Sequence, residues 1–381
     1  MKIIDRYVGK NVFVTMLIGV IVLSVVLVLG NLLTQLLDKL INQNVPLEVV
    51  LAFMAVVLPF SLTFSIPWGL LTALLLVFGR MSADNELIAL RSNGVSIPRI
   101  CVPIFALTLA LSGICFWINA DVAPRAAKKM AESLFDVATK NPISLFRADD
   151  VVDQIPDKRV YVGGKKGDTL LNLTIFDINQ RDGTPLKVIY AKRGQLVPDP
   201  KNQRLLLKFQ DARFEQRDSA DPRDIYKIQH GIVMGDGSFP IPLDSLYEEA
   251  HKASRLESYT LPELSAFIAK GPPPDMDKNA KKEFDNQKLQ AKVEMNRRFS
   301  ASLACIAFAL VAVPLGITTH RKETSAGFAL SLAIAFAYYF FIIVAITFRG
   351  NAAAQPILLM WIPNLIFIAL GSVLFFRLCK R

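Results

Sequence analysis

The sequence predicts a membrane protein with six transmembrane α-helices, arranged three and three, and an all-β domain inserted between the two sets. Two observations predict this fold class. Six apolar runs free of charged residues each contain at least the roughly 20 residues that an α-helix needs to cross the hydrocarbon core of a bilayer. A polar block with the pattern of β-strands separates the third run from the fourth. The runs lie at Asn11–Leu37, Val49–Gly79, Ile100–Ala120, Phe299–Thr319, Thr324–Phe348 and Gly350–Phe376.

The short loops predict which side of the membrane the inserted block occupies. Because Lys and Arg concentrate in cytoplasmic loops, the side that carries more of them is expected to be cytoplasmic. The other side's short loops carry only Lys39 and Arg349. Both termini are therefore expected in the cytoplasm, and residues 121–298 on the outer side. The basic residues of the cytoplasmic side are Lys2, Arg6, Lys10, Arg80, Arg91, Arg99, Arg321, Lys322, Arg377, Lys380 and Arg381.

Composition excludes several classes of function. The formal net charge of +10 does not indicate nucleic-acid binding, because much of the excess lies beside the apolar runs and no basic run is interleaved with aromatic residues. The absence of charge within the runs disfavours a carrier driven by protons or sodium. The sequence has no ATP-hydrolysis motif and no recognisable catalytic site. We therefore expect a non-catalytic protein without a cofactor, which would take energy from a partner.

The cysteines predict neither disulfides nor a metal site. Cys101, Cys115, Cys305 and Cys379 lie within the apolar runs or at the cytoplasmic end, and none lies in the inserted block. The block is therefore expected to fold without disulfides. Cysteines scattered in this way do not have the spacing of a metal site.

Two prolines interrupt the second apolar run. Each of Pro59 and Pro67 removes a hydrogen bond from a helix. We expect a short interfacial helix around Pro46–Val57, followed by a kinked span to Gly79. The alternative is a single, strongly tilted helix.

The block after the third run has strand signals separated by turn residues. A helical lead-in is expected at Val122–Thr139, and the strand spacing favours an antiparallel sandwich, open barrel or jelly-roll-like domain over a βαβ fold. In one strand, Leu205, Leu207 and Phe209 share a face, as a half-buried strand requires. The predicted strands are Arg159–Val162, Leu170–Ile178, Leu186–Ala191, Gln203–Gln216 and Tyr226–Val233, with turns at Gly163-Gly164, Asp182-Gly183, Pro198-Asp199-Pro200 and Asp221-Pro222.

Helical signals return before the fourth run. Thr260 has the features of an N-cap, with Pro262 in the first turn and Glu263 at the third position. A charged helix, Lys278–Arg298, is expected to continue directly into the fourth span. The predicted organisation is thus residues 1–121 for the first three spans, 122–255 for the β domain, 256–298 for a helical linker and 299–381 for the last three spans.

The loop between the second and third runs predicts a short cytoplasmic helix at about residues 82–94. Ser82 is a candidate N-cap, Asp84 and Glu86 suit the first turn, Arg91 suits the last turn, and Gly94 is a left-handed stop. The apolar residues Ala83, Leu87 and Leu90 share one face. One interpretation is a helix on the membrane surface. The acidic start instead favours a basic pocket on a protein partner, because surface helices prefer Lys and Arg.

Several motifs resemble the LptF/LptG family of lipopolysaccharide export permeases, and the resemblance covers essentially the whole chain. The most specific is the glutamate-to-glycine stretch within Asp84–Gly94, which is similar to the family's cytoplasmic coupling helix. Where many members carry a proline soon after Arg298, this chain has Ala301-Ser302. The weaker matches are Asp5-Arg6-Tyr7, Arg297-Arg298-Phe299, Ala312-Val313-Pro314-Leu315-Gly316, Tyr338-Tyr339 and Trp361-Ile362-Pro363-Asn364.

The resemblance implies a mechanism and a set of partners. Two related permeases would form a heterodimer in the bacterial inner membrane, and a dimeric cytoplasmic ABC ATPase would dock on their coupling helices. Glu86 would meet a basic groove on the ATPase, with Leu87 and Leu90 as apolar anchors. Lipopolysaccharide would enter laterally, between the first span of one subunit and the fifth of the other. It would then pass into a β-jelly-roll domain and along periplasmic bridge proteins of similar fold.

An anionic lipid with several acyl chains needs cations for its phosphates and an apolar wall for its chains. The candidate cations are Lys39, Arg125, Lys128 and Arg349, each of which is otherwise a surface charge near the outer interface. The candidate wall of the lateral gate is also explained by ordinary helix packing. It consists of Leu29, Leu32, Leu33 and Leu36 on the first span and Phe336, Phe340 and Ile343 on the fifth.

The sequence leaves two alternative functions open. A membrane-anchored periplasmic scaffold accounts for the outer domain, but gives no reason for an acidic, capped cytoplasmic helix. An ABC exporter subunit for another anionic lipid accounts for both features.

Overall fold

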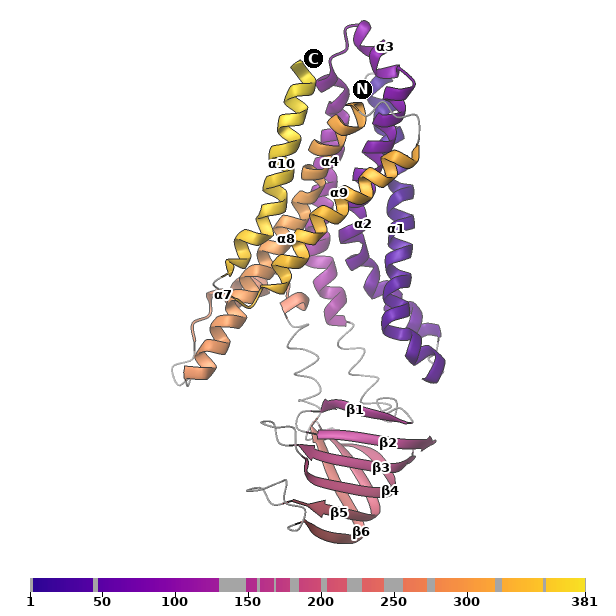
Figure 1. Ribbon diagram of the computed structural model, residues 1–381, viewed down its shortest axis with the longest axis vertical. Helices are drawn as coiled ribbons and strands as arrows, with labels where there is room; N and C mark the ends of the chain where they lie inside the picture. The colour runs from indigo at the N-terminus through magenta and orange to yellow at the C-terminus, as the bar shows by residue number, and fades with distance from the viewer. Residues whose placement is uncertain are drawn as a thin grey trace. The chain divides into compact units, whose positions relative to one another are not determined.

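The computed structural model describes most of the chain as two compact units, one helical and one built on a β-sheet (Figure 1). The helical unit comprises Met1–Leu37, Val45–Lys128 and Leu256–Arg381, and the remaining residues belong to the sheet unit. The described residues are 3–43, 47–129, 149–155, 158–167, 169–178, 185–199, 204–217, 228–242, 256–272, 278–318, 324–351 and 354–380.

The helical unit confirms the predicted arrangement of three plus three spans. Within the described residues, six helices are long and apolar enough to cross a membrane. The first three are α1 (Ile3–Gln43), α2 (Leu47–Ala83) and α4 (Ile97–Trp117), with the short α3 (Glu86–Ser92) between α2 and α4. The last three are α8 (Lys278–Thr318), α9 (Thr324–Thr347) and α10 (Pro356–Lys380).

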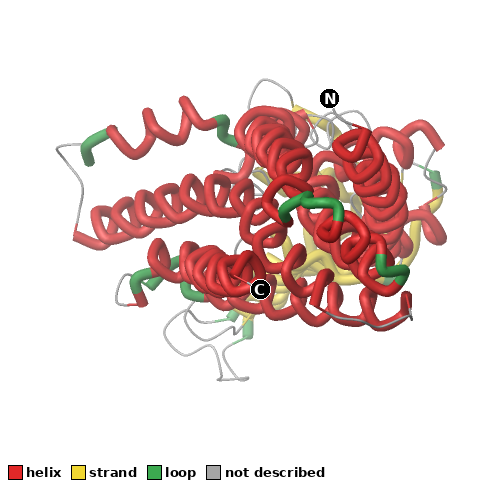
Figure 2. Tube along the Cα trace, turned by 90° about the horizontal axis from the view of Figure 1, so that it is seen from above, coloured by secondary structure: helices red, strands yellow, loops and turns green. Residues whose placement is uncertain are grey.

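Helices α2 and α8 form the centre of this unit. Each has 67% of its apolar stretch buried, against 28% for α1, α9 and α10. Leu70, Leu74 and Phe78 of α2 and Phe308 of α8 are fully buried. Helix α8 packs against α2, α4 and α10, and α9 packs against α2 and α10. Seen from above, the helices of this unit lie side by side (Figure 2).

Helix α2 differs from the preferred prediction. It is one continuous helix from Leu47 to Ala83, with Pro59 and Pro67 inside it, so the alternative of a single helix is the one observed. Neighbouring helices and hydroxyl side chains allow a membrane helix to keep its prolines. Pro67 lacks the N–H that would donate to the Thr63 carbonyl. At the next residue, Tyr339 of α9 donates a hydrogen bond to the Phe64 carbonyl.

The segments that flank the inserted block are helical, as predicted. Helix α4 continues through a π-helical turn, η1 (Ile118–Val122), into helix that is described as far as Lys129. The remainder of the predicted lead-in, to Thr139, lies outside the described residues. On the return, α7 (Leu261–Ala269) begins at a capping box between Thr260 and Glu263. Helix α8 then runs unbroken from Lys278 into the fourth span.

The sheet unit is a single antiparallel sheet of six described strands in sequence order, which confirms the predicted antiparallel β domain. The strands are β1 (Asp150–Ile155), β2 (Lys158–Lys166), β3 (Thr169–Ile178), β4 (Pro185–Asp199), β5 (Arg204–Gln216) and β6 (Gln229–Pro242). Strand β1 was not predicted, because its limits depend on pairing with β2. The prediction of a turn at Gly163-Gly164 was wrong, because both glycines lie within β2. The turn after β2 instead contains Gly167, whose φ of 58° is left-handed.

Alternation along the strands builds the core of this unit. Val160, Leu173, Leu207 and Phe209 are buried, and the predicted inward face of β5 is confirmed for Leu207 and Phe209. The ring of Phe209 lies over Gly237 of β6. A Cβ built at Gly237 would lie 2.2 Å from the Phe209 ring, so only glycine leaves room for this ring over β6.

Candidate functional site

Helix α3 lies where the sequence predicts a short cytoplasmic helix, but its start differs. Ser82 is not the N-cap: it belongs to α2, and its hydroxyl donates a hydrogen bond of 2.8 Å to the Ile317 carbonyl of α8. Helix α3 begins at Glu86 after Asn85, whose φ of 59° is left-handed. Asparagine tolerates this conformation better than most residues. Asp84 therefore lies in the turn before α3 instead of in its first helical turn.

Gly94 ends α3 as predicted, in a Schellman motif. Its φ is 78°, and its N–H donates to the Arg91 carbonyl over 2.9 Å. The Val95 N–H donates to the Leu90 carbonyl over 3.1 Å, which completes the paired bonds of this motif. Both ends of α3 are thus defined by residues in the left-handed region.

The apolar face of α3 packs against its own chain. Leu87 is 5% exposed and belongs to the core of the helical unit, with Leu90 and Val95 packed against that core. The expectation that Leu87 and Leu90 both face a partner does not fit this burial. Asp84, Arg91 and Ile88 are exposed, and Ile88 is 57% exposed. The outward surface of α3 is therefore acidic at its start and includes the large apolar side chain of Ile88.

The N-terminal triplet of α1 meets this loop. The hydroxyl of Tyr7 lies 3.2 Å from both carboxylate oxygens of Glu86 and donates to them. The carboxylate of Asp5 forms an ion pair of 2.8 Å with Arg99 in the first turn of α4. Sequence reasoning noted this triplet only as a motif, because residues separated by about 80 positions carry no local signal of contact.

Three of the predicted lipid-phosphate cations, Arg125, Lys128 and Arg349, belong to the helical unit. Arg125 pairs with Asp121 over 2.7 Å. The Thr260 N–H and hydroxyl lower the pKa of the Glu263 carboxyl, and Lys128 and Arg125 lower it further. Arg349 lies 3.9 Å from the carboxylate of Glu257. Lys39 lies on α1, with a side chain outside the described part of the chain.

The predicted gate residues that are described point outward. Leu29 of α1 and Phe336, Phe340 and Ile343 of α9 are exposed, and the three residues of α9 follow helical spacing along one face. This face is available to lipid or to another subunit. Leu32, Leu33 and Leu36 lie on α1, but their side chains are outside the described part.

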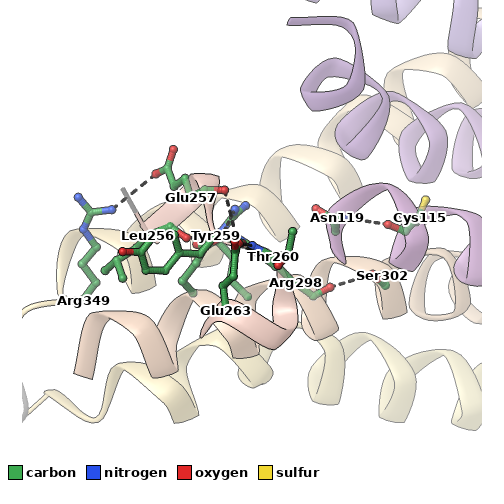
Figure 3. A network of polar contacts seen from close by, with 12 residues as sticks. Cys115, Asn119, Leu256, Glu257, Tyr259, Thr260, Glu263, Arg298, Ser302 and Arg349 are labelled. Carbon is green, nitrogen blue, oxygen red and sulfur yellow. Dashed lines mark hydrogen bonds and ion pairs between the residues drawn. The ribbon is translucent and has the colours of Figure 1, made fainter. Parts of the chain in front are cut away.

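A buried charge network at the entry of the fourth span was not predicted. Arg298, which is 1% exposed, donates to the carboxylate of Glu294. It also donates to the backbone carbonyls of Leu256, Glu257 and Tyr259 (Figure 3). Arg297 forms two further bonds to the same carboxylate. The spacing Glu294, Arg297, Arg298 at i, i+3 and i+4 is a signal for these pairs. The carbonyl partners have no signal in the sequence.

A second network joins α8, α9 and α10 in the apolar interior. The Tyr338 hydroxyl donates to the side-chain oxygen of Asn364 over 3.1 Å. The Asn364 amide donates to the carbonyl and to the hydroxyl of Ser300, both over 2.8 Å. Near the same place, the Trp361 indole N–H donates to Asn296 over 3.1 Å. The aromatic and asparagine motifs of α9 and α10 thus converge on α8.

The described residues contain no group of three or more His, Cys, Asp or Glu side chains placed to hold a metal ion. The sheet unit has an apolar groove of about 280 Å³. Ile175, Ile189, Phe209 and Phe214 form its apolar wall, and Asp177 and Lys187 are among its polar residues. The groove therefore combines an apolar wall with a carboxylate and an ammonium group.

Comparison with known proteins places the chain in one family. The family model described as "Lipopolysaccharide export system permease LptF/LptG" matches residues 6–377. No curated protein matches the chain in a sequence comparison.

Proposed function

The chain belongs to the LptF/LptG family of lipopolysaccharide export system permeases, and from this premise we propose that it is the membrane subunit of an ATP-driven exporter. As a member of that family it is a non-catalytic component of lipopolysaccharide transport and a multi-pass membrane protein. The proposal adds the source of energy, the path of the lipid and the orientation in the inner membrane.

The observation that carries the proposal is the position of α3. Its apolar face is buried against its own chain, while Asp84 and Ile88 are exposed and Glu86 is half-buried. A helix fixed in this way presents an acidic surface without burying apolar area in lipid. In our proposal this surface docks in a basic groove of a dimeric cytoplasmic ATPase, and Leu87 anchors the helix to the permease.

The orientation follows from the loop charges. With eleven Lys and Arg residues on the side of the termini and of α3, that side is cytoplasmic in our proposal, and the sheet unit is periplasmic. A paralogous permease would complete the membrane part as a heterodimer. The exposed faces of α1 and α9 would form the lateral gate, with Leu29 and Phe340 on its walls.

In this proposal the lipid moves from the gate to the sheet. Arg349, Arg125, Lys128 and Lys39 would bind lipid phosphates near the outer interface. For the first two, phosphate would compete with Glu257 and Asp121, the acids that pair with them in the free protein. The groove of the sheet unit would accept acyl chains, which then pass to a bridge of periplasmic jelly-roll proteins.

The central test is Glu86→Ala in the assembled complex. We expect weaker co-purification of the ATPase and lower ATP-dependent lipid release, because the partner's cations lose their acceptor. Glu283→Ala removes an exposed glutamate from the charged half of α8 and is the matched control. Unchanged ATPase binding and transport in Glu86→Ala would overturn the coupling role of α3.

A second experiment identifies the cargo. Photocrosslinking probes at Leu33 and Phe340 are expected to form ATP-dependent adducts with lipid, and mass spectrometry of these adducts names the lipid. Adducts to protein alone would support a scaffold. Adducts to a different anionic lipid would support an exporter whose substrate is that lipid.

A further inference from the structure

Two polar contacts hold the N-terminal end of α1 to the α3 region. The Tyr7 hydroxyl donates to both oxygens of Glu86, and Asp5 pairs with Arg99 of α4. We call these four residues the α1 clasp. Asp5 is 8% exposed and lies in the first helical turn of α1, where the helix dipole favours an acid.

C-terminal to the clasp, α1 packs against α4 and α2. Val8 and Val12 are fully buried, and a Cβ built at Gly9 would contact Pro103 of α4 at 3.8 Å. Further along, a Cβ built at Gly19 would lie 3.5 Å from the Gly69 Cα of α2, so the two helix backbones approach closely. Helix α1 is thus a continuous rod that begins at the clasp.

Helix α3 is held by its buried apolar face and by a polar contact with α1. The helix has 7 residues and is bounded by the left-handed residues Asn85 and Gly94, so neither neighbouring helix continues into it. Leu87 attaches its inner face to the core. On its first turn, the side chain that reaches α1 is Glu86, through Tyr7. This hydrogen bond therefore connects α3 directly to the first membrane-spanning helix.

We propose that Tyr7 is a positioning residue that links Glu86 to α1, so that a displacement of α3 is transmitted to the first membrane-spanning helix. The inference rests on the proposed function, in which a partner moves α3. A carboxylate accepts about four hydrogen bonds, so Glu86 can bind a cation of the partner while it holds the Tyr7 hydroxyl. Tyr7 then affects the amount of lipid released per ATP, and not the affinity of the permease for the ATPase.

The test compares Tyr7→Phe with wild type in the full complex in lipid nanodiscs that contain lipopolysaccharide. Tyr190→Phe removes an exposed hydroxyl from the sheet unit and is the matched control. We expect the affinity of Tyr7→Phe for the ATPase to stay within about twofold of wild type. The lipid released per ATP should fall by about threefold or more, since a hydrogen bond to a charged group is lost.

Spin labels give a readout that does not depend on transport. Labels at Lys10→Cys and Asn93→Cys, both exposed, are placed in a Cys379→Ser background. The wild-type distance distribution should be narrow, and Tyr7→Phe should broaden it, in the permease alone and in the complex. The double variant Tyr7→Phe/Glu86→Gln should be no worse in transport than Glu86→Gln.

The outcomes separate the two proposals. A wild-type ratio of lipid to ATP with an unchanged distance distribution in Tyr7→Phe overturns the role of Tyr7. If Glu86→Ala weakens ATPase binding, the proposed function stands. If wild type binds no ATPase, the proposed function fails, and the label distances in the permease alone still decide whether Tyr7 links α3 to α1.

Discussion

The guanidinium of Arg298 donates a hydrogen bond of 2.6 Å to the backbone carbonyl of Tyr259. The two residues are 39 positions apart, one inside α8 and the other just before α7. The bond joins the first residues described after the sheet unit to the start of the fourth span. The same guanidinium also binds the carboxylate of Glu294. The buried positive charge of Arg298 therefore has both a counter-ion and neutral hydrogen-bond acceptors.

Replacing Arg298 should destabilise the helical unit. Arg298→Ala leaves the three carbonyls and part of the Glu294 carboxylate without their donor, and breaking a buried pair costs about 3–5 kcal/mol. Arg298→Lys keeps the charge but lacks the fork geometry, and should fall between wild type and alanine. Thermal unfolding in detergent measures both variants. Arg125→Ala, which breaks an exposed pair, should change stability by about 0–1 kcal/mol; equal losses for Arg298 and Arg125 would contradict this account.

Gly69→Ala should separate α1 from α2. A Cβ at this position would lie 2.7 Å from Val20 Cγ2 and 3.1 Å from the Val20 backbone nitrogen. Since a backbone cannot yield as a side chain does, we expect a loss of about 1–3 kcal/mol, typical of overpacking. Gly79→Ala is the control, because nothing lies within 4 Å of its added Cβ. Unfolding temperatures in the same detergent compare the two, and an equal effect of both substitutions would refute the close approach.

A double-mutant cycle should detect the bond between Tyr338 and Asn364. Tyr338→Phe and Asn364→Leu each remove one partner, and hydrogen bonds between membrane helices average about 0.6 kcal/mol with a maximum near 1.7. Asn364 also binds Ser300, so its substitution should cost more than that of Tyr338. Denaturant unfolding of the four proteins measures the coupling. Strictly additive effects would show that the bond contributes nothing to stability.

The capping box of α7 should make stability depend on pH. The Thr260 N–H, then its hydroxyl, and then Lys128 and Arg125 lower the pKa of Glu263 from 4.5. A carboxyl with a lowered folded-state pKa stabilises above its unfolded pKa, and this contribution is lost as pH falls through the folded pKa. The advantage of wild type over Glu263→Gln should therefore be present at about pH 6 and shrink below about pH 4. A difference that is constant over this range would rule out Glu263 as the titrating group.

The features that sequence reasoning predicted well depend on local chemistry. The spans follow from runs of apolar residues, the start of α7 from Thr260 and Glu263, and the end of α3 from Gly94. Each of these signals acts within a few residues, so the chain itself contains the physical cause. Strand β1 and the true turn at Gly167 were missed because strand limits depend on pairing with the next strand.

The contents of the candidate site divide in the same way. That a short acidic helix lies between α2 and α4 was predicted from its charges and from its stop at Gly94, whereas the predicted N-cap Ser82 lies in α2. That its Leu87 is buried in the chain's own core, and that Tyr7 binds Glu86, depends on where α1 packs. The cations Arg125 and Arg349 were recognised, but their acidic partners Asp121 and Glu257 were not.

By itself, the sequence determined that this chain has six helices able to cross a membrane, places a β domain between the two sets of helices, and carries a short acidic helix after the second span. Hydrophobicity, capping and loop charge act locally and do not require a fold. Only the tertiary structure decided which polar groups share a bond. Hydrogen bonds and ion pairs act over about 3 Å, and only packing brings Arg298 to Tyr259, Asn364 to Tyr338 and Tyr7 to Glu86.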